Sequence, residues 1–433
     1  MKEKLLELYN NRLVKSFTVL FMGDGIAAAI SLVNMAILIK ALGSEVNGIF
    51  LMIQTYCLLF NDIFNFQSFN AIIKYLPYHI KKNEKRNIKS YIKQAFILDF
   101  VTAIIAFFIG YIFIDVFAKI MLWNNQIKVA ISIYLISVLF NISGTALGIL
   151  RVYGDYKKIA TTNVIINLIK LLFYCIGCNL KVGLMTFIIL ETFTEVIKNI
   201  LLISMAFTLL KVEGLNDFYK INLRFDREFF KFNIYSNIVS TLDLPIGHIT
   251  TFIISKYLGF NEITVFKVYQ KIGSLIEKVS TPINQIIFPE MSSLVSQKKY
   301  NEAFKLNKKL FYLISGVGSC AITFVALSYK AWIFIFIEDY QGVIFTLILY
   351  LIITIFSKAT LGIHPLFMSL GYIRYNVPII LICNSIYLII LIYLAKEYGL
   401  LGVIIARGLQ YISVVTIKYI FMRINYKKDY VIS

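Results

Sequence analysis

Long apolar segments, each about the length of a membrane-spanning helix, alternate with short polar connections along the whole chain. A helix needs roughly 20 mostly apolar residues to cross the hydrocarbon core of a bilayer. Segments of this kind fall near 16–38, 47–73, 94–117, 127–149, 159–178, 184–210, 232–255, 263–288, 310–337, 343–365, 377–395 and 400–422. The pattern therefore predicts an all-α membrane protein with about 12 transmembrane helices.

Composition agrees with this interpretation and removes several classes of protein. Of the 433 residues, 59% are hydrophobic, which is well above the usual share in soluble domains. The net charge of +19 is confined to short connections, so we expect anionic membrane lipids rather than nucleic acid as its partner. The five cysteines all lie within apolar segments, and we expect neither a metal site nor a cofactor.

The basic residues are distributed unequally between the two sides of the predicted bundle. Connections on one side, together with both tails, carry 28 Lys and Arg residues, whereas the connections on the other side carry 5. Basic residues collect on the cytoplasmic side of membrane proteins. We therefore expect a multi-pass protein of the bacterial inner membrane with both termini in the cytoplasm.

The second half of the chain resembles the first at an offset of 216 or 217 residues. The matching pairs are Gly43 with Gly259, Gly154 with Gly371, and Asn167 with Asn384. A unit with an even number of spans must repeat in the same direction. We therefore predict two parallel six-helix lobes around a central cavity, with the N-lobe in 1–210, a cytoplasmic linker in 211–231 and the C-lobe in 232–433.

Four predicted spans carry a narrow polar stripe, with residues that recur at helical spacing on one face. The stripes are Gln54, Asn61, Asn65 and Ser68; Asn163, Asn167, Lys170 and Tyr174; Glu191, Glu195 and Lys198; and Lys267, Lys271, Ser274 and Lys278. Polar groups at membrane depth are costly and normally face a bundle interior or a watery cavity. The stripes therefore predict that these spans line one wet space.

The chemistry of the stripes indicates what this space binds. Lysines suit an anionic headgroup such as a diphosphate, while neutral amides and hydroxyls suit sugar hydroxyls. The candidate substrate-binding residues are Lys170, Lys198, Lys267, Lys271, Lys278, Asn167 and Asn61. Glu191 and Glu195 either belong to this space as ion-coupling groups or serve mainly to neutralise Lys198 and a neighbouring helix.

Two further carboxylates lie beside helix breakers at matching places in the two halves. Asp24 lies between two glycines in the first span, and Asp243 precedes Pro245 and Gly247 in the seventh. Interrupted helices at corresponding places of a repeat point to a transport site, so both carboxylates are candidates for coupling to H⁺ or Na⁺. The alternatives are an interfacial position for Asp24 and an ion pair with a cavity lysine for Asp243.

Three segments together resemble a known family over essentially the whole chain. The segments 37–50 (ILIKALGSEVNGIF), 150–160 (LRVYGDYKKIA) and 285–294 (QIIFPEMSSL) are similar to those of Wzx-type polysaccharide flippases. The resemblance implies the fold of the multidrug/oligosaccharidyl-lipid/polysaccharide exporter superfamily. It also implies movement of undecaprenyl-pyrophosphate-linked oligosaccharide repeat units, such as those of O-antigen or capsule, to the periplasmic leaflet. A polysaccharide polymerase complex is a possible partner.

Other functions compete with this interpretation. A cation-coupled drug antiporter of the same superfold would favour an acidic, aromatic cavity, which the lysine stripe of the eighth span opposes. A membrane glycosyltransferase or polymerase needs a sizeable outer loop for its catalytic groups, and the outer loops here are short. A lipid II flippase is close in mechanism and stays open. We therefore expect a transporter rather than an enzyme.

Overall fold

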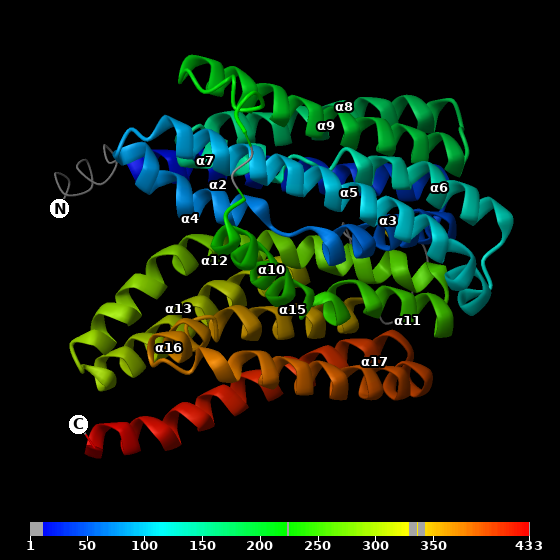
Figure 1. The fold of residues 1–433 in the computed structure, drawn as a ribbon. Coiled ribbons are helices and arrows are strands. Elements are labelled where there is room, and N and C mark those ends of the chain that lie inside the picture. The colour runs from blue at the N-terminus through cyan, green and yellow to red at the C-terminus, as the bar shows by residue number, and fades with distance from the viewer. Residues whose placement is uncertain (1–11, 223–224, 329–335, 337–342, 433) are drawn as a thin grey trace. The chain divides into compact units, whose positions relative to one another are not determined.

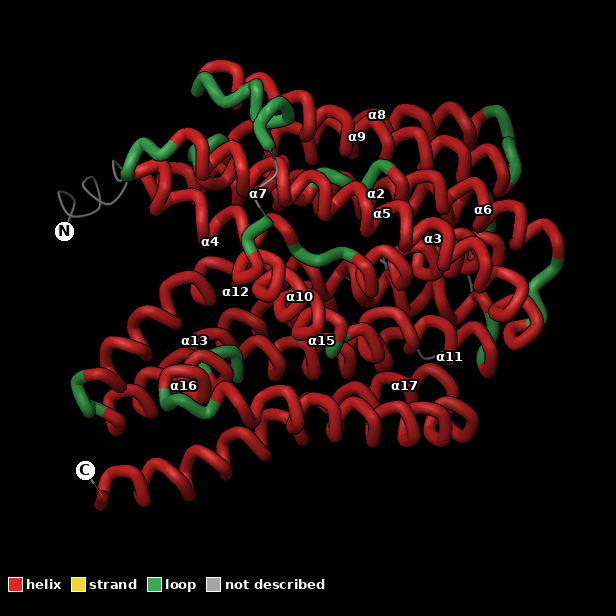
Figure 2. Tube along the Cα trace, viewed as in Figure 1, coloured by secondary structure: helices red, strands yellow, loops and turns green. Residues whose placement is uncertain are grey.

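A computed structural model of the chain describes residues 12–222, 225–328, 336 and 343–432, without the side chains of 12–21, 276, 278–286, 289 and 426–432. This part of the chain consists almost entirely of helices joined by short loops (Figure 2). Ten of its helices are long and apolar enough to cross a membrane. The predicted all-α membrane fold is confirmed.

The number of 12 spans stays a prediction. The expected eighth span lies in helix α12 (Phe260–Ser296), which is not among the ten. The expected last two spans lie in α17 (Ile373–Ile432), whose backbone is non-helical at Gly399. Figure 1 shows that the chain reverses direction within α17, so this element holds a pair of antiparallel helices.

The chain divides into two compact units, residues Met1–Leu244 and Pro245–Ser433. The helices of the first unit (Figure 1) are α2 (Arg12–Leu42), α3 (Ser44–Phe64), α4 (Ser68–Lys81), α5 (Lys85–Met121), α6 (Asn125–Leu139), α7 (Gly144–Val152), α8 (Tyr156–Asn179), α9 (Leu184–Val212) and α10 (Arg227–Thr241). Helix α10 packs against α3 and α4, and it therefore falls in this unit although it begins within the predicted linker at 211–231 and extends beyond it. The division into lobes at that linker stays a prediction.

The second unit contains a π-helical turn at Pro245–Ile249 and the helices α11 (Thr250–Tyr257), α12, α13 (Tyr300–Leu327), α15 (Val343–Ala359), α16 (Ile363–Ser369) and α17. Its core lies where α12, α13, α16 and α17 meet, with Met291, Phe367 and Met422 fully buried there or nearly so. The interruption expected near Asp243 is therefore present, since α10 ends at Thr241 and the π-helical turn follows Leu244.

Backbone conformation supports the predicted repeat. Gly43 and Gly259 each precede a helix with a positive φ, of 76° and 121°, and Gly154 and Gly371 have φ of 81° and 84°. Positive φ is readily adopted by glycine but costly for other residues. The same backbone conformation thus recurs at the offset that the sequence indicates.

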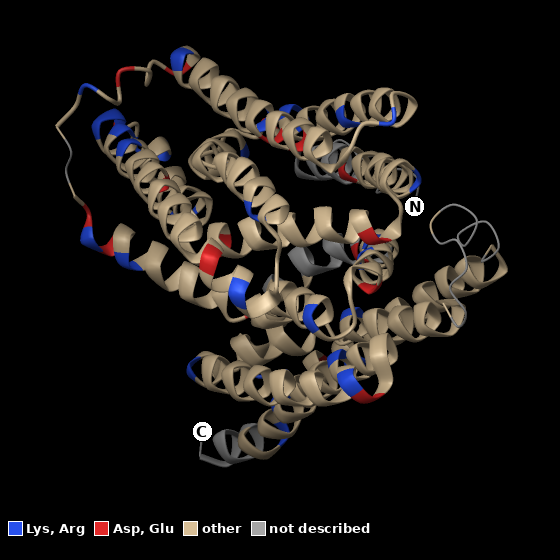
Figure 3. Cartoon of the chain, turned by 90° about the vertical axis from the view of Figure 1, so that its right-hand side faces the viewer, with Lys and Arg blue, Asp and Glu red and all other residues tan. Residues whose placement is uncertain are grey.

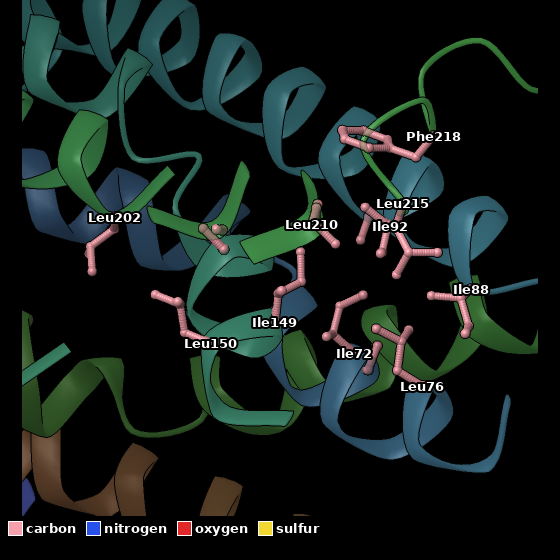
Figure 4. Packing of buried hydrophobic residues seen from close by; sticks show 14 of the residues in the cluster. Ile72, Leu76, Ile88, Ile92, Ile149, Leu150, Leu202, Leu210, Leu215 and Phe218 are labelled. Carbon is pink, nitrogen blue, oxygen red and sulfur yellow. The ribbon is translucent and has the colours of Figure 1, made fainter. Parts of the chain in front are cut away.

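One end of the first unit holds a dense apolar core (Figure 4). Ile72 and Leu76 of α4 meet Ile149 of α7, Leu210 of α9 and Phe218 of the following loop. Each of these five side chains is 5% exposed or less. This core packs the short helices α4 and α7 against the long helices α5 and α9. Each short helix follows a break in the chain, between α3 and α4 and between α6 and α7.

The starts of α4 and α7, which follow these two breaks, both bond to the carboxylate of Asp99 in α5. Oδ2 of Asp99 accepts hydrogen bonds from the backbone N–H of Thr145, at 2.8 Å, and from its hydroxyl, at 2.7 Å. The Ser68 side chain, at the start of α4, bonds to the same carboxylate. A negative charge is favoured at a helix N-terminus, and here one carboxylate serves the first turns of α4 and α7 together.

Gly144 and Asn237 provide further contacts around the two breaks. A Cβ on Gly144 would lie 2.8 Å from Oγ of Ser68 and 3.3 Å from Oδ2 of Asp99, so a larger residue would displace the side chains that bond here. At the open end of α3, the amide of Asn237 in α10 donates to the carbonyls of Ile63 and Asn65, at 3.1 and 2.7 Å. The unpaired backbone groups of the break are thus bonded by side chains, as a membrane interior requires.

We expect Asp99→Asn to lower the stability of the protein. The amide keeps the size of the side chain but places a donor among groups that donate, and a hydrogen bond to a charged group contributes about 1.5–3 kcal/mol. Thermal unfolding of the detergent-purified protein measures the effect. Asp115→Asn on the same helix is the control, because that carboxylate is 71% exposed and pairs with Lys128 at the surface. Equal melting temperatures for the two variants would contradict the role of Asp99.

Candidate functional site

The first unit holds a buried ionic network between α8 and α9. The ammonium of Lys170 lies 2.8 Å from Oε1 of Glu191 and 2.8 Å from Oε1 of Glu195. Lys198 pairs with the other oxygen of Glu195. The side chains of Lys170 and Glu191 are only 12% and 7% exposed, so these charges compensate each other away from solvent.

Helical spacing explains why these residues meet. Glu191, Glu195 and Lys198 recur on one face of α9, and Lys170 lies on the face of α8 that packs against it. One hydroxyl and one amide complete the network. The hydroxyl of Tyr174 donates to Oε2 of Glu191, and the amide of Gln54 in α3 donates to Oε1 of the same residue at 2.9 Å. We name Lys170, Glu191, Glu195 and Lys198 the ionic quartet.

The ionic quartet has no net formal charge, because two lysines balance two glutamates. A buried ion pair is stable only when its desolvation is offset by good geometry and added hydrogen bonds, and Tyr174 and Gln54 supply such bonds. Lys170 is thus paired directly with two carboxylates, those of Glu191 and Glu195, in a specific contact between α8 and α9 that the sequence did not predict.

A cavity of about 110 Å³ adjoins the ionic quartet inside the first unit. It is lined by Cys57, Leu58, Asn61, Tyr134, Ser137, Val138, Asn141, Glu195, Lys198 and Asn199. Amide bonds order its wall: Asn141 donates to Oδ1 of Asn61 at 2.6 Å, and Asn61 donates to Asp62 at 3.0 Å. The structure therefore brings three predicted site residues, Asn61, Glu195 and Lys198, to the same space.

Two other predicted residues, Asp24 and Asn167, lie on the seam between α2 and α8 and are not among the residues lining this cavity. Asn163 donates to Oδ1 of Asp24 at 3.3 Å, and Asn167 donates to the carbonyl of Asn163 at 2.8 Å. The expected interruption of the first span at Asp24 is wrong, since α2 is continuous from Arg12 to Leu42. The neighbouring glycine serves packing instead: a Cβ on Gly23 would lie 2.6 Å from Cβ of Ala160 in α8.

The second unit contains a cluster of cations. The ammonium of Lys267 on α12 is within electrostatic reach of Lys271 on the same helix and of Arg407 on α17. We name Lys267, Lys271 and Arg407 the cationic cluster. Figure 3 shows that such charged positions are few along otherwise uncharged helices.

Aromatic rings hold the guanidinium of Arg407 in place. It lies 5.5 Å from the ring of Tyr350 and 5.9 Å from that of Phe266, and it donates a 3.2 Å hydrogen bond to the hydroxyl of Tyr411. Its Nη1 atom is buried and has no hydrogen-bond partner among the described residues. A nearby carboxylate, Glu277, forms an ion pair with Lys358 at 3.2 Å. The cluster thus combines buried positive charge with an unused donor.

The remaining predicted positions lie apart or outside the description. Asp243 is exposed in the turn between α10 and the π-helical turn, which corrects the expectation of a buried carboxylate. Lys278 belongs to α12, but its side chain lies outside the described residues. Among the described residues, no group of three or more His, Cys, Asp or Glu side chains is arranged to hold a metal ion.

Sequence reasoning missed Arg407 and Asp99. Both are single charges in apolar spans, and a search for stripes of several polar residues passes over them. The repeat contains a usable signal for Arg407: Gly183-Leu184 and Gly399-Leu400 match at an offset of 216, which aligns Arg407 with Glu191. Nothing comparable marks Asp99, whose role depends on two helix breaks that the periodicity did not reveal.

Comparison with known proteins identifies the family. The profile of the family described as "Polysaccharide biosynthesis protein" matches residues 13–295, about two thirds of the chain. The chain belongs to the polysaccharide biosynthesis protein family.

Relatives of this polysaccharide biosynthesis protein agree with the assignment. The capsular polysaccharide biosynthesis protein CapF of Staphylococcus aureus is 22% identical over 363 residues, covering 80% of this chain and 85% of CapF. A multidrug resistance MATE family transporter of the MOP superfamily, in an inward-facing conformation, matches with a TM-score of 0.71 at 15% identity, over 92% of this chain and 95% of the other. The lipid II flippase MurJ matches with a TM-score of 0.68 at 14% identity, over 94% and 87%. The fold is thus that of MOP superfamily transporters.

We expect Lys170→Met to be the most destabilising substitution in the ionic quartet of this polysaccharide biosynthesis protein. It leaves Glu191 and Glu195 without their shared cation, and the loss of one partner from a buried pair costs about 3–5 kcal/mol. Thermal unfolding in detergent at neutral pH measures the loss. Lys157→Met on the exposed surface of α8 is the matched control. A melting temperature equal to that of the control contradicts the assignment of Lys170 as the centre of the network.

Proposed function

We propose that the protein is a flippase that translocates undecaprenyl-pyrophosphate-linked oligosaccharide repeat units across the inner membrane for surface polysaccharide synthesis. The cationic cluster of the second unit carries this proposal. Lys267 lies within electrostatic reach of the like charges of Lys271 and Arg407, like charges repel strongly at low dielectric, and an anion bound beside Arg407 lowers this cost. A diphosphate is such an anion. In the proposed substrate it joins a lipid to a sugar, and a molecule of this kind has to be moved by a membrane transporter.

Arg407 makes the cluster suited to a diphosphate in particular. A guanidinium presents parallel N–H donors that match phosphate oxygens bidentately, while a lysine acts as a compact point charge. Nη1 of Arg407 is buried without a hydrogen-bond partner among the described residues. In the proposal, this donor binds a phosphate oxygen while Lys267 and Lys271 neutralise the remaining charge, and Lys278 extends the same face of α12.

The family and the fold support the same substrate class. The matched family is one of polysaccharide biosynthesis, and CapF is described as a capsular polysaccharide biosynthesis protein. MurJ is described as a lipid II flippase, so a solved protein of this fold acts on a lipid-linked sugar. A MATE drug transporter shares the fold too, but the cationic cluster disfavours a cationic drug as the cargo here.

We further propose how the substrate moves. The two six-helix lobes would rock about a shared central cavity, with both termini in the cytoplasm, so that the cavity opens to each leaflet in turn. An H⁺ or Na⁺ gradient is the proposed energy source, with Asp24, Asp243, Glu191 and Glu195 as the candidate coupling groups. Lys170, Lys198, Asn61 and Asn167 are the candidate substrate contacts of the first unit, and a polysaccharide polymerase complex would receive the product.

We expect Lys267→Ala combined with Lys271→Ala to abolish export of the surface polysaccharide while the amount of membrane-inserted protein stays normal. The physical reason is that two of the three charges that attract the diphosphate are removed. Cells lacking the gene are complemented with the variant, and their surface polysaccharide is measured by immunoblotting. Lys256→Ala together with Lys396→Ala is the charge-matched control and should export normally, because both lysines lie beside the ring of Tyr257 in the same unit and outside the cationic cluster. Normal export by the first pair refutes the cationic site.

We expect Arg407→Lys to reduce translocation at least tenfold, because it keeps the charge but loses the bidentate donor geometry. The assay is translocation of the native lipid-linked oligosaccharide by purified protein in proteoliposomes. Arg423→Lys is the matched control, since Arg423 lies on the same helix and donates to Tyr419 four residues earlier, at 3.0 Å, as Arg407 donates to Tyr411 four residues later. If both variants transport at the wild-type rate, a positive charge suffices at position 407, and the proposed bidentate contact between Arg407 and the phosphate is wrong.

A further inference from the structure

The cavity of the first unit differs in its chemistry from the cationic cluster. Of its lining residues, Asn61, Asn141 and Asn199 present amides, and Ser137 and Tyr134 present hydroxyls. The charged residues at its edge, Glu195 and Lys198, pair with each other. The wall is therefore rich in hydrogen-bonding groups and has no net formal charge, so it offers an anion little attraction.

The cavity has room for a guest larger than one water molecule. Its volume of about 110 Å³ is several times the roughly 10–15 Å³ that one water needs by the same measure. Asn199 is only 4% exposed, and its side-chain Oδ1 already accepts a 2.7 Å hydrogen bond from the hydroxyl of Ser143. The lining is thus held in position by its own bonds before any guest arrives, which reduces the ordering that binding requires.

Tyr134 contributes a phenol to this wall. The residue is 5% exposed and lines the cavity. It lies within electrostatic reach of Glu191 and Glu195. A buried hydroxyl costs free energy unless a partner satisfies it, and a hydroxyl-bearing guest is one such partner.

We infer that this cavity, lined by Tyr134, Ser137 and Asn141, is the subsite that recognises the sugar of the lipid-linked substrate. The inference rests on the proposed function and adds a division of labour: the second unit binds the charged diphosphate, and the first unit reads the uncharged sugar. Paired donors and acceptors suit a polyol, whose hydroxyls both donate and accept. A site built from such groups discriminates strongly against a ligand that lacks the matching hydroxyls.

The test uses the full-length protein in detergent and two probes. The first probe is the lipid-linked oligosaccharide extracted from cells that lack the gene, and the second is the same extract after mild acid has released the sugar. Affinities for both are measured by competition against a fluorescent undecaprenyl diphosphate. We expect the wild type to prefer the intact lipid by at least tenfold.

Ser137→Leu fills the cavity without changing any charge. We expect this variant to bring the ratio of the affinities for the intact and the hydrolysed lipid close to one. Its affinity for the hydrolysed lipid should be unchanged. Ser132→Leu is the matched control, because both serine hydroxyls bond to a carbonyl of their own helix, at 2.7 Å for Ser137 and 3.0 Å for Ser132, and Ser132 does not line the cavity. Should Ser137→Leu fail to fold, Tyr134→Phe removes one hydroxyl at constant volume and should lower the preference at least threefold.

The outcomes separate the two proposals. A wild type that binds neither lipid overturns the proposed function. A wild type that binds both lipids equally, or variants at Ser137 and Tyr134 that keep the full preference, overturns the sugar subsite and leaves the cationic site standing. Loss of the preference in the Ser137 or Tyr134 variant alone, with Ser132→Leu unaffected, supports the subsite.

Discussion

A polar group inside a membrane has no bulk water to solvate it, so it must find its partner in the protein or in the molecule that the protein carries. The two units meet this constraint in different ways. In the first unit, lysines and glutamates of α8 and α9 satisfy each other, and Asn237 and Asp99 bond the backbone groups left open by broken helices. In the second unit, Arg407 keeps a donor without a partner among the described residues. This contrast distinguishes polar groups that bond to each other within the protein from a donor that has no partner among the described residues.

The matched offsets place opposite charges at equivalent positions of the repeat. Glu191 and Arg407 are 216 residues apart, and each is the centre of its own environment: the glutamate accepts from lysine, tyrosine and glutamine, while the arginine lies among aromatic rings. The predicted repeat would thus place the same helical position in two environments, a network with no net formal charge around Glu191 and a group of cations around Arg407.

Much of the fold could be predicted from the sequence, because the length of an apolar segment and the spacing of polar residues on a helix are local properties. The stripes of α8 and α9 were visible in this way, and the structure joins Lys170 to Glu191 and Glu195 as neighbouring faces allow. The single charges Asp99 and Arg407 were missed because their meaning depends on contacts between segments far apart in sequence. Gly23 misled for a similar reason, since a glycine that permits close packing against Ala160 looks the same in sequence as one that breaks a helix.

The identity of the residue at position 407 also bears on the conditions under which the protein works. A guanidinium does not release its proton in any environment that a living cell tolerates, whereas an ammonium placed among like charges is more readily neutralised. An arginine at the centre of the cluster therefore secures one permanent attraction for an anion. Acidification or alkalinisation of the growth medium leaves that charge in place.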